Sequence, residues 1–190
     1  LQAKQKAWIE EKIPHLAHLV TWLTQWPETA FQGVIIANEV LDAMPVHRFL
    51  HHEHGIFESM ITRNENGTLI EQFKPSSNPR LIDYVTQALP PHPLPYCSEV
   101  NLYLESWLTS CANLLTKGLM LIIDYGFPRH EYYHPDRDQG TIMCHWHQTA
   151  HSNPLIHVGQ QDITAHVDFT HVAECASRAG FRIDGFANQA

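Results

Sequence analysis

Two short, continuous runs of aliphatic residues stand out from the mixed pattern of apolar and polar positions along this chain. They occupy residues 33–37 and 119–123. Runs of this length and composition are typical of strands that are buried on both faces, as in a parallel sheet. A helix that leads into an apolar strand, twice over, predicts an α/β sheet with right-handed crossovers.

The region after the first run has antiparallel character. Three strand-like pieces are separated by turn signals, at residues 47–52, 56–63 and 69–73. The signal between the last two is Asn66-Gly67, and both residues tolerate the positive φ angles of a type I′ turn. The pattern predicts an antiparallel hairpin insertion over residues 47–75.

The next region, residues 76–117, is predicted to be helical. One helix covers residues 78–89 and ends at a proline cluster. We expect Ser98 to cap a second helix, with Glu99 complementing its dipole and with Lys117 and Gly118 at its end. Apolar positions of this second helix repeat at helical spacing, at Leu104, Trp107, Leu108, Cys111 and Leu115.

The two ends of the chain predict further elements. Residues 1–12 are good helix formers. Residues 16–23 fit either a helical stripe or a short strand, and the pattern alone does not decide between them. The last third predicts a strand over 141–147, a helix that Asp168 caps and that runs to residue 179, and a final strand over 181–187.

Composition and charge exclude several classes of protein. The 190 residues contain 12 Lys and Arg against 20 Asp and Glu, which gives a formal net charge of −8 with histidine neutral. This acidity argues against a nucleic-acid partner, because basic side chains are needed to bind its phosphate backbone. It is compatible with a cationic substrate. No apolar run approaches the ~18–20 residues of a membrane span, and no signal-type segment opens the sequence. We expect a cytoplasmic protein with no nucleic-acid and no membrane partner.

Cysteine and histidine are the residues that would indicate a disulfide scaffold or a metal site. The four cysteines include no CxxC pair, so we expect them to be reduced and mostly buried. The 15 histidines form local clusters within residues 51–54 and 145–151. Neighbours at i and i+2 share a strand face without forming a tetrahedron, and no H-E-x-x-H motif occurs. We therefore predict no metal site, with a histidine-dependent metallohydrolase as a further alternative.

Polar groups follow both aliphatic runs directly. Asn38, Glu39 and Asp42 come after the first run, and Asp124 and Tyr125 come after the second. Ligands of doubly wound α/β sheets bind beyond the carboxyl ends of the parallel strands, so we expect these side chains to converge at one rim. The alternative is structural: Asn38 would cap a short helix, and Asp124 would belong to an ordinary turn.

Five segments resemble the MidA-type S-adenosylmethionine-dependent methyltransferases, in the family's order. They are ANEVLDAMPV (37–46), SEVN (98–101), IDYG (123–126), EYYHP (131–135) and QDITAHVDF (161–169). The resemblance implies an α/β, class I methyltransferase (Rossmann-like) fold with a mainly parallel sheet, and S-adenosylmethionine as cofactor. Mitochondrial members of the family are protein arginine methyltransferases that assist assembly of respiratory complex I. For this chain the resemblance thus implies a protein substrate that is methylated on arginine, with a respiratory-complex subunit as one candidate. It also implies a location in the cytoplasm or in a mitochondrial matrix.

The resemblance also implies that residues 1–190 are a single partial, N-terminally truncated domain. In the family, the glycine-rich cofactor loop and the acidic residue that holds the ribose precede the position of Leu1, and no G-x-G-x-x-G occurs here. The first strands and the C-terminal continuation would then be missing, residues 20–22 would form the third strand, and the isolated chain would be inactive. A non-catalytic binding or assembly module of the same fold, which recognises a partner through the hairpins, is the alternative.

Methylation of arginine calls for carboxylates, because they hold a guanidinium by bidentate hydrogen bonds. We assign this catalytic role to Glu39, with Asp42 supporting it or orienting the loop. Asn38 leaves the strand end directly and would lie closest to the methionine part of the cofactor or to the acceptor.

The resemblance assigns substrate binding to residues of two later motifs. Asp124 and Tyr125 would shape the acceptor pocket, and an ordinary turn is the alternative. Tyr132, Tyr133 and His134 are expected in a loop that lines the peptide channel, and a surface aromatic cluster is the alternative.

Overall fold

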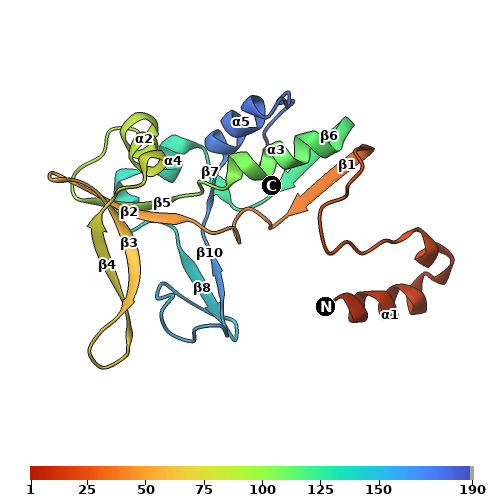
Figure 1. Ribbon diagram of the computed structural model, residues 1–190, viewed down its shortest axis with the longest axis horizontal. Coiled ribbons are helices and arrows are strands. Elements are labelled where there is room, and N and C mark those ends of the chain that lie inside the picture. The colour runs from red at the N-terminus through yellow and green to blue at the C-terminus, as the bar shows by residue number, and fades with distance from the viewer. Residues whose placement is uncertain (189–190) are drawn as a thin grey trace.

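The computed structural model describes residues 1–188. They form a mixed α/β structure with two two-stranded parallel sheets, a three-stranded antiparallel sheet and a four-stranded antiparallel sheet (Figure 1). The helices are α1 Gln2–Lys12, α2 Pro79–Ala88, α3 Leu104–Leu114, α4 Arg129–Tyr132 and α5 Phe169–Arg178, with the 3-10 helices η1 Pro14–Leu19 and η2 Pro135–Arg137. The strands are β1 Phe31–Asn38, β2 His47–His52, β3 Gly55–Arg63, β4 Leu69–Pro75, β5 Tyr96–Val100, β6 Leu115–Ile123, β7 Gly126–Phe127, β8 Met143–Trp146, β9 Thr149–His151, β10 Asp162–Thr164 and β11 Val167–Asp168.

The two aliphatic runs form the parallel pair β1–β6, as predicted. The last paired residues are Asn38 and Ile123, so both strands end at the same edge. Helices α3 and α5 pack on one face of the pair, where Ala37 is buried among their apolar side chains. On the other face, Val34 is 58% and Ile36 is 65% exposed. The expected burial on both faces is therefore wrong for residues 1–188, because their helices cover one face only.

The antiparallel hairpins predicted over residues 47–75 form, and β5 extends them to a sheet with the strand order β4-β3-β2-β5. The turn between β3 and β4 is not the predicted type I′ turn. Gly67 has a φ of +77°, but Asn66 is not in the left-handed region. The Asn64 Oδ1 accepts hydrogen bonds from the backbone N–H groups of Asn66 and Thr68. This side-chain acceptor organises a longer loop than the two residues expected.

The helical region 76–117 is confirmed only in part. Helix α2 forms, and the Asn78 side chain caps it. Ser98 does not cap a helix, because it lies with Glu99 in β5, where both residues are fully buried. The ladder between β5 and β2 uses the backbone groups that a helix would need. Lys117 and Gly118 lie in β6, which follows α3 without a break, so they do not end the helix.

The two ends of the chain give mixed outcomes. Helix α1 forms as predicted and lies with η1 away from the sheets (Figure 1). Residues 20–22 are not a strand: the backbone at Val20 is extended, but no described strand pairs with it. Asp168 caps α5, as expected. The final strand over 181–187 is wrong, because these residues pair with no strand of the described chain.

Parallel pairing between strands is confined, within residues 1–188, to β1–β6 and β7–β11. The other strand pairs are antiparallel. The expected mainly parallel sheet is therefore not what this part of the chain forms.

The four cysteines are free and buried, as predicted. In the described part of the chain, no helix combines the length and the apolar character that crossing a membrane requires.

Candidate active site

The segments that follow β1 and β6 meet at one rim. The backbone N–H of Glu39 donates to the Ile123 carbonyl oxygen over 2.9 Å. The Asp124 Oδ2 accepts hydrogen bonds from the backbone N–H groups of Leu41, at 2.9 Å, and Asp42, at 3.3 Å. The expected convergence of the two strand ends is therefore observed. The alternative of a short helix capped by Asn38 is not observed. This segment is a turn, and its N–H groups bind the Asp124 carboxylate at the end of the other strand.

Negative charge accumulates at this rim. Burial, followed by the charges of Asp124, Glu39 and Asp162, raises the pKa of the Asp42 carboxyl, against a hydrogen bond from the Ala43 backbone. The Asp42 Oδ1 is buried and has no hydrogen-bond partner among the described residues. The Glu39 carboxylate is the main cause that raises the pKa of the exposed Tyr125 hydroxyl. Like charges held this close favour a cationic ligand.

Glu39 has a left-handed backbone conformation, with a φ of +48°. A non-glycine residue adopts this region at a cost of about 1–3 kcal/mol, and such residues cluster at functional sites. Neighbouring hydrogen bonds hold the conformation, since its own N–H and those of Leu41 and Asp42 all bind groups of the β6 end.

Residues 165–167 connect both parts of the rim. The backbone N–H of Ala165 donates to the Asp42 carbonyl oxygen at 2.9 Å, and that of Val167 donates to the Tyr125 carbonyl oxygen at 2.8 Å. Between them, the N–H of His166 donates to the Thr141 Oγ1 at 2.9 Å. This segment, which we call the rim strap, fixes the two loops relative to each other.

The predicted loop with Tyr132, Tyr133 and His134 is different in the structure. Tyr132 ends helix α4, and both tyrosines are almost fully buried, at 2% and 1% exposed. Their rings fill an apolar cluster with Phe49 and Leu81, which is why they are not in a solvent-facing loop. His134 is exposed, and its Nδ1 accepts a hydrogen bond from the backbone N–H of Asp136.

Glu99 is a buried carboxylate that sequence reasoning placed at a helix start. Its Oε1 accepts hydrogen bonds from the Thr141 N–H (2.7 Å), the Thr141 hydroxyl (2.5 Å) and the Tyr132 hydroxyl (3.1 Å). Burial raises the pKa of Glu99 despite these donors. Its Oε2 has no described partner, and a Cβ at Gly140 would overlap with it. Glu99 thus holds Thr141, which in turn holds the rim strap at His166.

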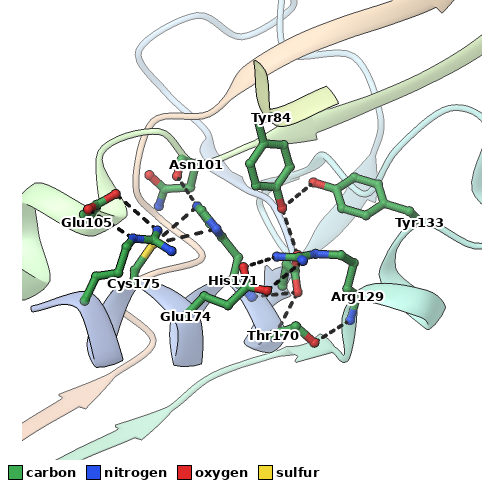
Figure 2. A network of polar contacts seen from close by, with 11 residues as sticks. Tyr84, Asn101, Glu105, Arg129, Tyr133, Thr170, His171, Glu174 and Cys175 are labelled. Carbon is green, nitrogen blue, oxygen red and sulfur yellow. Dashed lines mark hydrogen bonds and ion pairs between the residues drawn. The ribbon is translucent and has the colours of Figure 1, made fainter. Parts of the chain in front are cut away.

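A second polar network ties the helices together (Figure 2). Besides capping α5, Asp168 accepts hydrogen bonds from the Tyr84 hydroxyl at 3.0 Å and the Arg129 Nε at 3.2 Å. The Arg129 guanidinium also forms a bidentate pair with Glu174, at 2.9 and 2.6 Å. Helices α2, α4 and α5 are thereby fastened to one another beside β11.

The histidine clusters do not assemble a metal site in the structure. Within residues 1–188, no group of three His, Cys, Asp or Glu residues is placed to hold a metal ion. Two histidines do approach each other, since the His51 Nδ1 lies 2.9 Å from the His92 Nε2.

Comparisons with known proteins place the chain in a family. No curated protein matches it. An uncharacterized COG1565 superfamily protein from Burkholderia thailandensis is 36% identical, with a TM-score of 0.88 over 95% of this chain and 47% of that chain. A COG1565 superfamily member from the same organism, bound to S-adenosyl-homocysteine, is also 36% identical, with a TM-score of 0.87 over 95% of this chain and 46% of that chain. The chain therefore spans about half the length of these solved structures. A family model described as "Putative S-adenosyl-L-methionine-dependent methyltransferase" matches residues 1–187, and the chain belongs to that family.

Proposed function

We propose that this chain is part of a methyltransferase that uses S-adenosylmethionine to methylate an arginine side chain of a protein. The observation that carries the proposal is the acidic rim, where Glu39, Asp42 and Asp124 meet at the ends of the parallel strands β1 and β6. Ligands of α/β sheets bind at this position. The solved relative with S-adenosyl-homocysteine supports the choice of cofactor.

Each residue of the rim has a distinct task in this proposal. The Glu39 carboxylate would hold the acceptor guanidinium by bidentate hydrogen bonds and aim one nitrogen at the methyl group. The unpaired Oδ1 of Asp42 would accept a further N–H from the cation. Asp124 would keep both carboxylates in place through the N–H groups that it binds, and the exposed Tyr125 would border the acceptor.

The residues of this chain fit the charged end of the cofactor. An acidic rim suits a sulfonium cation as well as a guanidinium, and Asn38, at the end of β1, would hold the methionine part. When bound, the cofactor supplies the electrophilic methyl group. The chain contains no G-x-G-x-x-G segment for close backbone approach to the nucleotide, so we assign adenosine binding to no residue here.

The test uses the full-length protein with radiolabelled S-adenosylmethionine and a protein extract of cells that lack its gene. We expect methylarginine in the hydrolysed product, detected by mass spectrometry, and a loss of about 100-fold or more for Glu39→Gln, because the guanidinium is no longer aimed. Glu65→Gln, at an exposed carboxylate of the β3–β4 loop, is the matched control. Equal rates for both variants would remove Glu39 from the mechanism.

Calorimetry with S-adenosylmethionine on the same full-length protein separates the proposal from its alternative. We expect binding for the wild type and for Glu39→Gln. If the wild type neither binds the cofactor nor transfers a methyl group, a non-catalytic binding module of this fold replaces the enzyme.

A further inference from the structure

The rim strap leaves one side chain free. All three of its backbone N–H groups are used, by Asp42, Thr141 and Tyr125. Ala165 and Val167 are buried, at 4% and 6% exposed, whereas His166 between them is exposed. His166 therefore occupies a fixed position between the two loops that carry the acidic rim.

The imidazole of His166 packs against one aromatic ring and faces two charges. Its ring centroid lies 5.3 Å from that of Phe127. The Arg137 guanidinium lies 4.0 Å from the centroid of the same Phe127 ring. The charges of Arg137 and Asp124 both act on the imidazole. Within residues 1–188, its ring nitrogens have no hydrogen-bond partner, whereas the Nε2 of the buried His171 lies 3.3 Å from the Asn101 carbonyl oxygen.

We propose that His166 accepts the proton that the acceptor guanidinium loses during methyl transfer. The inference rests on the proposed function and adds the base to it. The guanidinium nitrogen forms a bond to the methyl carbon, the bond between carbon and sulfur breaks, and its electron pair stays on the sulfur. The methylated nitrogen then carries an excess proton, which passes to a nitrogen of the imidazole and from there to water.

The other groups of the rim are less suited to this step. Asp124 already accepts hydrogen bonds on both oxygens. Glu39 is required to hold the cation, and a carboxylate is a weak base at neutral pH. Partial burial and Arg137 lower the pKa of His166, against the opposing charge of Asp124, so the imidazole is neutral at pH 7 and can take up a proton. Its exposed position allows the proton to leave.

The experiment compares two variants of the full-length protein in the methylation assay described above. His166→Gln removes the base, and His166→Phe removes it while keeping a ring against Phe127. We expect both to fold, to bind S-adenosyl-homocysteine in calorimetry as the wild type does, and to lose about 10²–10⁴-fold in rate. The acidic limb of the wild-type pH–rate profile should disappear in both variants. His130→Gln, at an exposed histidine of α4, is the control with unchanged rate.

Chemical rescue adds a measurement that a structural role would not move. Added imidazole should restore part of the rate of His166→Ala and none of the rate of Glu39→Gln. Wild-type rates and an intact acidic limb in His166→Gln would overturn the inference while leaving the proposed function in place. An acidic limb that disappears only in Asp42→Asn would assign the base to Asp42 instead. If the wild-type protein transfers no methyl group at all, the proposed function fails and His166 loses its role with it.

Discussion

Replacement of Glu99 tests how a buried carboxylate supports the rim. Glu99→Leu fills a similar volume but leaves the Thr141 N–H, the Thr141 hydroxyl and the Tyr132 hydroxyl without an acceptor. A buried donor that loses its partner costs about 1–3 kcal/mol, so three of them amount to roughly 3–6 kcal/mol after some relaxation. This is a large share of the ~5–15 kcal/mol that stabilises a domain. Glu99→Gln keeps a carbonyl oxygen for the same donors and should cost much less near neutral pH.

The same pair of proteins makes a prediction about pH. Burial raises the pKa of Glu99 in the folded protein above its unfolded value. A group with a raised folded pKa contributes stability that is fully present below the unfolded pKa and is lost as the pH rises through the folded pKa. The wild type should therefore lose stability relative to Glu99→Gln as the pH increases from about 4 towards neutrality.

Urea unfolding of the full-length proteins, followed by tryptophan fluorescence at several pH values, measures both effects. We expect a large drop in the free energy of unfolding for Glu99→Leu and a small one for Glu99→Gln. Equal losses for the two variants would show that the three donors find other acceptors. A wild type that gains stability over Glu99→Gln as the pH rises would refute the raised pKa.

Three further predictions follow from named contacts. Asp168→Ala should lower the free energy of unfolding by about 3–5 kcal/mol, because it removes the cap of α5 and leaves the Arg129 guanidinium with Glu174 as its remaining partner. Asp168→Asn keeps the cap and should lower that free energy clearly less in the same urea assay. Glu105→Gln should change that free energy by less than about 1 kcal/mol, since the pair with Arg178 is about half exposed; a larger salt-sensitive loss would contradict the exposed geometry. Burial raises the pKa of Cys97, Cys111 and Cys175 to about 11. A thiol reagent at pH 8 should therefore label the cysteines of this chain slowly in the native protein and rapidly in guanidinium. Fast labelling of any of the four cysteines in the native protein would contradict their burial.

The sequence predicts those parts of the fold that local patterns determine. The runs that form β1 and β6 are short, aliphatic and bounded by polar groups. Such a pattern predicts a strand regardless of which other strand it pairs with. Helix α5 has a capping residue, Asp168, and a helical repeat of apolar positions. Because parallel strands end at the same edge, the meeting of Glu39 and Asp124 also followed from the sequence.

The errors arise where a distant partner decides the structure. The stretch 96–100 contains Ser98 and Glu99, which resemble the start of a helix, yet β2 pairs with it and every residue of it is buried. The acceptor role of Glu99 depends on Thr141 and Tyr132, which are far along the chain, so no local pattern indicates it. One sequence feature is consistent with this role of Glu99: a glycine, Gly140, precedes Thr141 and leaves room for the Glu99 carboxylate.

The three carboxylates of the rim differ in the number of oxygens that remain free to accept a hydrogen bond from a ligand. Asp124 binds backbone N–H groups with both oxygens, so its charge is present but its acceptors are occupied. Asp42 keeps one oxygen unpaired in a buried position, and Glu39 is presented on a strained backbone. A cation that entered here would pair with the last two while Asp124 held their loop in place. Burial, and after it the repulsion from the neighbouring carboxylates, raises the pKa of Asp42. Because such a cation would relieve that repulsion, its binding and the folding of this loop should stabilise each other.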